Sequence, residues 1–491
     1  MFYTYKEGDE ATLLGLKVVV VLFTLAHWVF LGFILVIIAT LIARKQPILP
    51  GALGILAVGL AERFSFPGAL EIMFRALMLS MQNLLTIILL IGMVVALTKL
   101  LQDTGADVII TQPLQTLRDP VLSYWVLGVV MWAMTLFLWP TPAVTLLGAV
   151  LVPTLSRSGL NPMAIAMSLA IFGEGLGLSG DFVIQGAPSL LSKATGLPLA
   201  SVLDALWPVV LASGLAAAAV GDWQQRRLSK HTGAMTAILP HTQAGNQGKS
   251  KLASKTKIEN TGAHPKNTNP AARMIGFLVL GGYAVAIAIL ILGKIKGDGA
   301  SAIIGGVTLI ILITGTLLKD RGNAFSTFVE YVRHGLRFSI GTFTPIIIMA
   351  GFFFMGTASG TLAVFDRHEP GFFSDFATSL AQVFPLNKWV AGLFVMLTAM
   401  LGSMDGSGFS GLPLTGGIAV ALSEAAGLPL APLAVLGQIA SIWTGAVLIP
   451  WGFAAVTAAV AGVEAQTLVK YNLPSYLTAL AVAYLWTMMR L

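Results

Sequence analysis

The chain has 491 residues, of which 56% are hydrophobic and only 10% are charged, and it contains no cysteine. Soluble domains carry about 25% charged residues, so this composition, with a mean hydropathy of +0.84, excludes a water-soluble globular protein. The missing cysteines exclude disulfides and thiolate metal sites, and the net charge of +7 has a local source and needs no nucleic acid to explain it.

Apolar runs of about the length that crosses a bilayer recur along the whole chain, at 18–43, 84–99, 125–139, 275–293 and 473–489. A spanning helix needs roughly 20 apolar residues, and run length predicts about ten to twelve such helices. The first run is too long for a cleaved signal peptide, so we expect it to remain as a helix. The sequence therefore predicts an all-α, polytopic protein of the bacterial inner membrane, surrounded by lipid.

A hydrophilic segment at 222–272 interrupts the apolar pattern near the middle of the chain. Between Asp222 and Arg273 there are nine Lys and Arg residues against two acidic ones. Such a composition favours disorder, and basic connecting loops stay on the cytoplasmic side. We therefore expect a first membrane repeat at 1–221, a basic, disordered cytoplasmic linker at 222–272 and a second membrane repeat at 273–491.

The two halves resemble each other in four segments that occur in the same order with similar spacing. The pairs are 74–92 with 332–351, 125–128 with 389–392, 155–166 with 422–434, and 192–203 with 458–469. This order predicts an internal repeat. An odd number of crossings in each half would make the copies inverted, a recurring design of secondary transporters, while an even number would make them parallel.

Helix-breaking residues interrupt the apolar runs twice in each half. The stretch "LGSMDGSGFSGLPLTGG" at 401–417 is rich in glycine, and "WPTP" at 139–142 is its counterpart; further breaks follow at 172–189 and 441–453. Non-helical backbone at membrane depth is tolerated only inside protein or beside a water-filled cavity. It exposes N–H and C=O groups that attract ions. We expect these breaks to converge on one central cavity.

Three carboxylates lie in the breaks and are the first candidates for ion binding. A carboxylate deep in a bilayer is costly and usually functional, so Asp405 is predicted to bind a proton or a sodium ion unless its loop lies at the interface. Glu174, in "GEG", is predicted likewise, and Asp181 is either an ion ligand or a helix N-cap.

Other candidates are chosen only by their position in the breaks, where small polar residues also serve in helix packing. They are Pro140, Thr141, Pro142, Thr145, Ser403, Ser407, Ser410, Thr415, Thr444 and Pro450.

One short motif invites an enzymatic interpretation. The segment 408–411, "GFSG", fits the GxSG pattern of rhomboid-type intramembrane serine proteases, but that chemistry needs a histidine base and no histidine follows His368. The sequence has no Walker loop, no HExxH motif and no His/Cys cluster. We therefore expect no enzyme, no resident cofactor and no metal centre; the expected ion is a coupling H⁺ or Na⁺.

The overall plan resembles the ion transporter superfamily. The similarity lies in two related halves, a hydrophilic central linker, and broken segments followed by "SGLNP" at 158–162 and "ATGLP" at 194–198. That superfamily includes gluconate, lactate, citrate and C4-dicarboxylate permeases and certain sodium–proton antiporters. The resemblance implies paired re-entrant hairpins with tips near 140–145 and 403–415 that hold substrate and ion. It also implies elevator-like movement against a scaffold, often within a homodimer.

Three functions stay open at this point. The first is a secondary carrier of a small organic anion, a carboxylate, coupled to protons or sodium. The second is a sodium–proton type antiporter, which Asp405 and Glu174 favour because carboxylate carriers of this superfamily commonly have neutral Ser, Thr and Asn at the tips. The third is a membrane scaffold without transport activity. The expected partners are thus a small anion or monovalent cation, the bilayer and a second copy of the chain, and no nucleic acid.

Overall fold

The computed structural model describes residues 12–13, 16–17, 23–107, 118–157, 159–232, 270–295 and 298–491. Apart from the short antiparallel pair of β1 (Thr12–Leu13) and β2 (Leu16–Lys17), the regular elements are helices. Nine helices of the described residues are long and apolar enough to cross a membrane. The prediction of an all-α, multi-pass membrane protein is confirmed.

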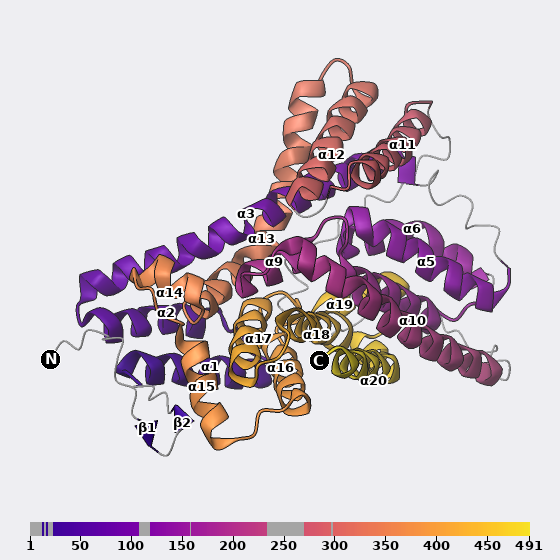
Figure 1. Ribbon diagram of the computed structural model, residues 1–491. Helices are drawn as coiled ribbons and strands as arrows, with labels where there is room; N and C mark the ends of the chain where they lie inside the picture. Colours follow the sequence, from indigo (N-terminus) through magenta and orange to yellow (C-terminus); the bar gives the residue numbers. More distant parts are fainter. Residues whose placement is uncertain are drawn as a thin grey trace.

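The first half consists of helices that follow one another along the chain (Figure 1). They are α1 (Leu25–Ile42), α2 (Ile48–Arg63), α3 (Phe66–Thr104), α5 (Pro120–Leu138), α6 (Pro140–Arg157), α7 (Pro162–Ser168), the π-helix η2 (Leu169–Gly177), α8 (Leu178–Gly180), α9 (Gly186–Thr195) and α10 (Leu199–Thr232).

The second half repeats this order and adds two short helices, α14 and α15. Its elements are α11 (Pro270–Leu292), α12 (Asp298–Lys319), α13 (Ala324–Phe354), α14 (Ala358–Phe365), α15 (Phe372–Val383), α16 (Lys388–Gly402), α17 (Leu412–Ala426), α18 (Leu430–Ile442), the π-helix η3 (Trp443–Leu448), α19 (Phe453–Ala461) and α20 (Ala465–Arg490).

Equivalent elements of the two halves make equivalent contacts. The long helices α3 and α13 lie side by side, as do α10 and α20, and η2 packs against η3. In each half, the second helix of the hairpin crosses to the other half: α6 packs on α19, and α17 packs on α9. This reciprocity is what two copies related by a two-fold axis produce. The direction of the copies in the bilayer stays a prediction.

The predicted boundary between the first repeat and the linker falls inside a helix. Helix α10 continues through Thr232, and an ion pair of 2.8 Å joins Asp222 and Arg226, one helical turn apart, beyond its apolar part. Helix α11 begins at Pro270, slightly before the predicted boundary. The rest of the predicted linker, 233–269, lies outside the described residues.

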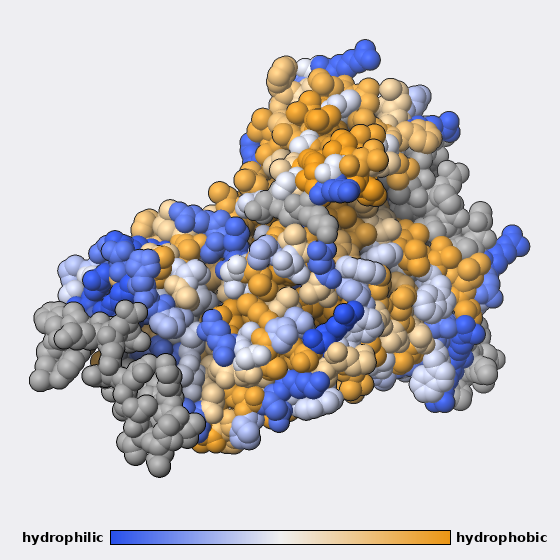
Figure 2. Space-filling view, viewed as in Figure 1, coloured by the Kyte–Doolittle hydropathy of each residue, from blue (hydrophilic) through white to orange (hydrophobic). Residues whose placement is uncertain are grey.

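Burial separates an outer group of spanning helices from an inner one. Only 28% of the α11 span and 33% of the α1 span are buried within the chain, against 94% for Pro162–Gly180 and 89% for Leu430–Ala461. Figure 2 shows apolar side chains over the projecting α11–α13 region, with hydrophilic ones at its tip. The two inner spans are the ones that contain η2 and η3, so the broken helices lie where protein, not lipid, surrounds them.

Glycines in the second hairpin turn allow backbone to pack directly on backbone. A Cβ added to Gly445 of η3 would lie 2.6 Å from the Cα of Gly408, and one added to Gly452 would lie 2.6 Å from the Cα of Gly406. Phe453 also donates its N–H to the carbonyl of Gly406 at 3.3 Å. The glycine-rich sequence therefore allows close backbone contact between the turn and the segment that includes η3.

Replacing Gly445 with alanine should destabilise the protein, since the new methyl group has no room against Gly408. Overpacking of this kind costs about 1–3 kcal/mol, which should appear as a lower melting temperature of the purified protein in detergent. Gly341→Ala is the matched control, because Gly341 lies within α13 and has nothing within 4 Å of the added Cβ. Equal melting temperatures for the two variants would contradict the close contact.

Candidate functional site

Each half contains a helical hairpin, and the two turns differ in construction. The first, between α5 and α6, reverses at the single residue Trp139, whose φ of 64° lies outside the usual range for a non-glycine residue. Pro140 then opens α6, a position that suits proline because the missing N–H would be unpaired there. The second turn joins α16 to α17 through the glycine-rich residues 403–411.

The tips of the hairpins meet. The ring of Trp139 lies 5.1 Å, centroid to centroid, from the ring of Phe409 in the second turn, and Phe343 of α13 lies 6.0 Å from Phe409. All three rings are fully buried. The two turns thus approach each other as the sequence predicts, but three aromatic rings fill the space between them.

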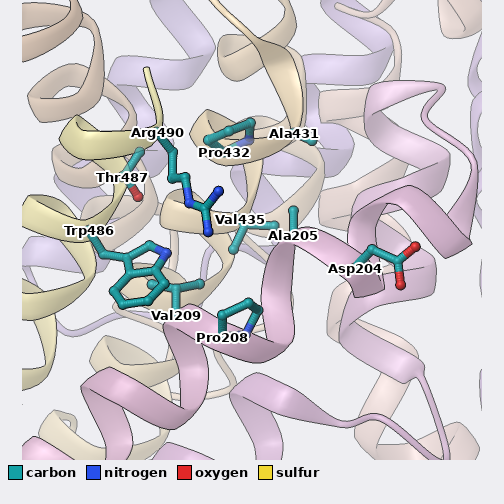
Figure 3. A pocket seen from close by; sticks show the side chains of 10 residues that line it. All are labelled: Asp204, Ala205, Pro208, Val209, Ala431, Pro432, Val435, Trp486, Thr487 and Arg490. Atoms are coloured by element: carbon teal, nitrogen blue, oxygen red, sulfur yellow. The ribbon is translucent and has the colours of Figure 1, made fainter.

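A cavity of about 320 Å³ lies elsewhere, between α10, α18 and α20 (Figure 3). Its walls are mainly apolar, from residues such as Val209, Val435 and Trp486, and its charged lining residues are Asp204 and Arg490. None of the residues predicted from the sequence to bind substrate or ion lines it.

Asp405 is half-buried at the tip of the second hairpin and holds the turn together. Its Oδ1 accepts the N–H of Ser407 at 3.0 Å, and its Oδ2 accepts the hydroxyl of Ser407 at 2.8 Å. The Ser407 Oγ in turn accepts the N–H groups of Phe409 at 3.1 Å and Ser410 at 3.3 Å. Both carboxylate oxygens therefore have donors from the same turn that leads into α17.

Asp181 is a buried cap for the start of α9. Its Oδ2 accepts the N–H of Gly186 at 2.6 Å and that of Ala187 at 3.3 Å, and its Oδ1 accepts the N–H of Gln185 at 3.1 Å. These are N–H groups that the first turn of a helix leaves unpaired. A Cβ on Gly186 would lie 3.2 Å from the Trp139 ring, so this capped loop borders the first hairpin tip.

Glu174 differs from both aspartates. It lies in η2, is 1% exposed, and its Oε1 accepts the hydroxyl of Thr457 from α19 of the other half. Among the described residues, no donor reaches its Oε2. The neighbouring glycines allow apolar groups to approach on both sides: a Cβ on Gly173 would collide with Met131, and one on Gly175 would lie 2.7 Å from Trp443.

Most of the candidate hydroxyl groups already donate a hydrogen bond to a backbone carbonyl. Thr145 donates to Pro142, Ser410 to Gly402, Thr415 to Gly411 and Thr444 to Ala440, while Ser403 is paired with the hydroxyl of Ser441. Pro450 follows η3 in a turn. Thr141, in the first turn of α6, is the exception: within the described residues its buried Oγ1 has no partner.

Several residues of this region were not predicted from the sequence. Trp139, Phe343 and Phe409 are common residues of apolar helices, and nothing in the sequence shows that their rings meet. Gln438 could have been found, because a lone amide in the apolar run of α18 is expensive unless it is bonded. Its Nε2 donates to the carbonyl of Ser179 at 2.8 Å and so joins the two halves.

Comparison with known proteins fits this architecture. No protein-family model matches the chain. It is 32% identical, over 434 residues, to the uncharacterized membrane protein YhfA of Bacillus subtilis (strain 168), and the match covers 87% of this chain and 90% of YhfA. The chain belongs to the same family as YhfA.

The fold of this YhfA relative resembles that of a solved transporter structure. The crystal structure of the YdaH transporter of Alcanivorax borkumensis, described as having an unusual topology, superimposes with a TM-score of 0.54 over 94% of this chain and 97% of YdaH. The sequences are 15% identical, so the likeness concerns the fold alone. It agrees with the expectation of a membrane transporter, but it does not place the chain in the ion transporter superfamily.

Because the chain has no native cysteine, the contact between the tips can be tested by cross-linking. The double variant Trp139→Cys with Phe409→Cys should be joined within one chain by a short bifunctional maleimide, detected by mass spectrometry. Pairing Trp139→Cys with Phe325→Cys is the control, since Phe325 lies 18 residues, about 27 Å along α13, from Phe343. Equal yields from the two pairs would show that the tips do not meet.

Removal of the Asp181 cap should destabilise the protein. Asp181→Ala leaves the N–H groups of Gly186 and Ala187 without their acceptor, while that of Gln185 keeps the backbone carbonyl of residue 181. Loss of a cap costs about 0.5–2 kcal/mol. Thermal unfolding in detergent should show a lower melting temperature than the parent. Glu71→Gln, at a surface pair with Arg75 that is largely exposed, should be nearly neutral; a larger effect of this control would argue against the capping role.

Proposed function

We propose that the chain is a secondary active transporter that moves a small organic anion, a carboxylate, across the bacterial inner membrane, coupled to protons or sodium. The observation that supports this most is the meeting of two hairpin tips, one from each half, beside two broken helices in the most buried part of the chain. A fold shared with the YdaH transporter supports the same conclusion, as does the resemblance of the sequence plan to the ion transporter superfamily.

The first turn of α6 is the best candidate for binding the anion. Helix N-termini attract negative charge because their first N–H groups are unpaired and the helix dipole is positive there. In this region the start of α9 is already occupied by Asp181, and Ser407 accepts two N–H groups ahead of α17. At the start of α6, Pro140 and Pro142 have no N–H, so the donors are the N–H and the unpartnered hydroxyl of Thr141. A substrate carboxylate would find both kinds of donor on this one residue.

Alternating access would then be a movement of the inner helices against the outer ones. The inner group comprises the hairpins and the helices that contain η2 and η3; the outer group comprises α1–α3 and α11–α13, among which the α1, α11 and α12 spans are the least buried. An elevator-like movement would expose the tips to each side of the membrane in turn. The exposed apolar surface of α11 suits contact with lipid or with a second copy in a homodimer.

A cation antiporter is the second candidate, and the buried carboxylate of Glu174 favours it. Such an antiporter would exchange a proton for sodium without an organic substrate. The two candidates differ in whether a carboxylate is required. A panel of carboxylates and monovalent salts, scored by the rise in melting temperature that a bound ligand produces, separates them and identifies the compound for transport assays.

In proteoliposomes, uptake of that carboxylate should require an inward proton or sodium gradient. Thr141→Val should raise the KM for uptake about three- to tenfold, because one hydrogen bond contributes about 0.5–1.5 kcal/mol. Thr145→Val is the matched control, since the Thr145 hydroxyl is already bonded to the Pro142 carbonyl. Uptake at the same rate with and without either gradient would refute the proposed coupling. No uptake of any carboxylate would refute the proposal that the protein is a carboxylate carrier.

A further inference from the structure

Glu174 is the one carboxylate of the broken segments whose charge is not stabilised on both oxygens. Asp181 receives three backbone N–H groups, and Asp405 receives a backbone N–H and a hydroxyl. Glu174 receives only the Thr457 hydroxyl on Oε1, although it is the most deeply buried of the three. Donors from their own turns thus reach both oxygens of each aspartate, whereas the second oxygen of Glu174 has no donor among the described residues.

The surroundings of Glu174 offer no compensating charge. Helices α5 and α19 and the π-helix η3, all of which pack against η2, contain no acidic residue, lysine, arginine or histidine. On α10 the charged residues are Asp204, near its start, and those from Asp222 onward; on α6 the only one is Arg157, the last residue. Among the described residues, none forms an ion pair with Glu174 within 4.0 Å.

Removing an ionised carboxylate from water without a partner costs several kcal/mol, and the group avoids this cost by binding a proton. We propose that Glu174 is the proton-binding residue of this protein, with the proton on Oε2 and with Oε1 accepting the Thr457 hydroxyl. A proton taken from water on one side converts the carboxylate to the neutral acid, and its release to water on the other side restores the carboxylate. A sodium ion would need several oxygen ligands, of which Glu174 and Thr457 supply only two side chains.

The position of Glu174 suggests how a proton would be coupled to movement. Its hydrogen bond crosses from η2 of the first half to α19 of the second, and Trp443 of η3 packs beside Gly175. The neutral acid fits this closed arrangement, whereas the ionised form requires water and therefore a separation of the two halves. This inference rests on the proposed transport, but proton binding itself can be measured without a substrate.

Infrared difference spectroscopy of the purified full-length protein, in lipid nanodiscs at high and low pH, tests the proposal. A buried protonated carboxyl should give a C=O stretching band that shifts in D₂O and is lost in Glu174→Gln. Asp405→Asn is the matched control and should retain the band. Thr457→Val, which leaves Glu174 in place, should move the band to higher frequency because the carbonyl oxygen loses its donor.

A band that persists in Glu174→Gln, or a spectrum with only ionised carboxylates at every pH at which the protein stays folded, would overturn the assignment. If Glu174→Gln does not fold, the Thr457→Val shift decides alone: an unmoved band would reject the site. The transport proposal fails separately. If the expected band is seen but the protein takes up no carboxylate, the proton site at Glu174 is supported and the carrier proposal is refuted. If sodium drives carboxylate uptake and the band is absent, the proton site is refuted and the carrier proposal stands.

Discussion

The structure depends on one constraint: a backbone that leaves the helical hydrogen-bond pattern at membrane depth must find its partners within the protein. In the second half, glycine meets this constraint, because Gly406 and Gly408 lie so close to Gly452 and Gly445 that side chains would not fit. The first half instead reverses within a single residue, Trp139. In both halves the break lies in the best-protected part of the molecule, and this protection is what allows the broken segments to exist.

The buried carboxylates differ in whether they accept hydrogen bonds from the broken backbone. A turn needs acceptors for the N–H groups that start the next helix, and Asp181 and the Asp405–Ser407 pair supply them from within the turns. An acidic residue inside a membrane protein is therefore not by itself evidence of an ion site. The distinguishing feature is the number of donors that reach it, and by this measure Glu174 stands apart from the two aspartates.

Much of the fold could be predicted from the sequence because hydrophobic run length, proline and glycine act locally. The helices, the breaks at Pro140 and near Asp405, and the repeated order of elements all follow from such signals. The sequence did not indicate that α10 continues to Thr232, past the predicted start of the linker at 222, because the residues there are polar in composition. The ring contacts at the tips and the Glu174–Thr457 bond join residues far apart in the chain, so only the fold brings them into view.

The contacts between the halves also determine what kind of movement the fold can support. Glu174 and Gln438 both reach across the boundary between copies, one to a hydroxyl and the other to a backbone carbonyl. The Gln438 bond is between neutral groups and is indifferent to protonation, whereas the Glu174 bond changes with it. If Glu174 binds a proton as proposed, the boundary combines one bond that is indifferent to protonation with one that responds to it, so part of the boundary can separate while the rest stays packed. This is what a transporter needs if its two copies are to remain packed while the site between them alternates.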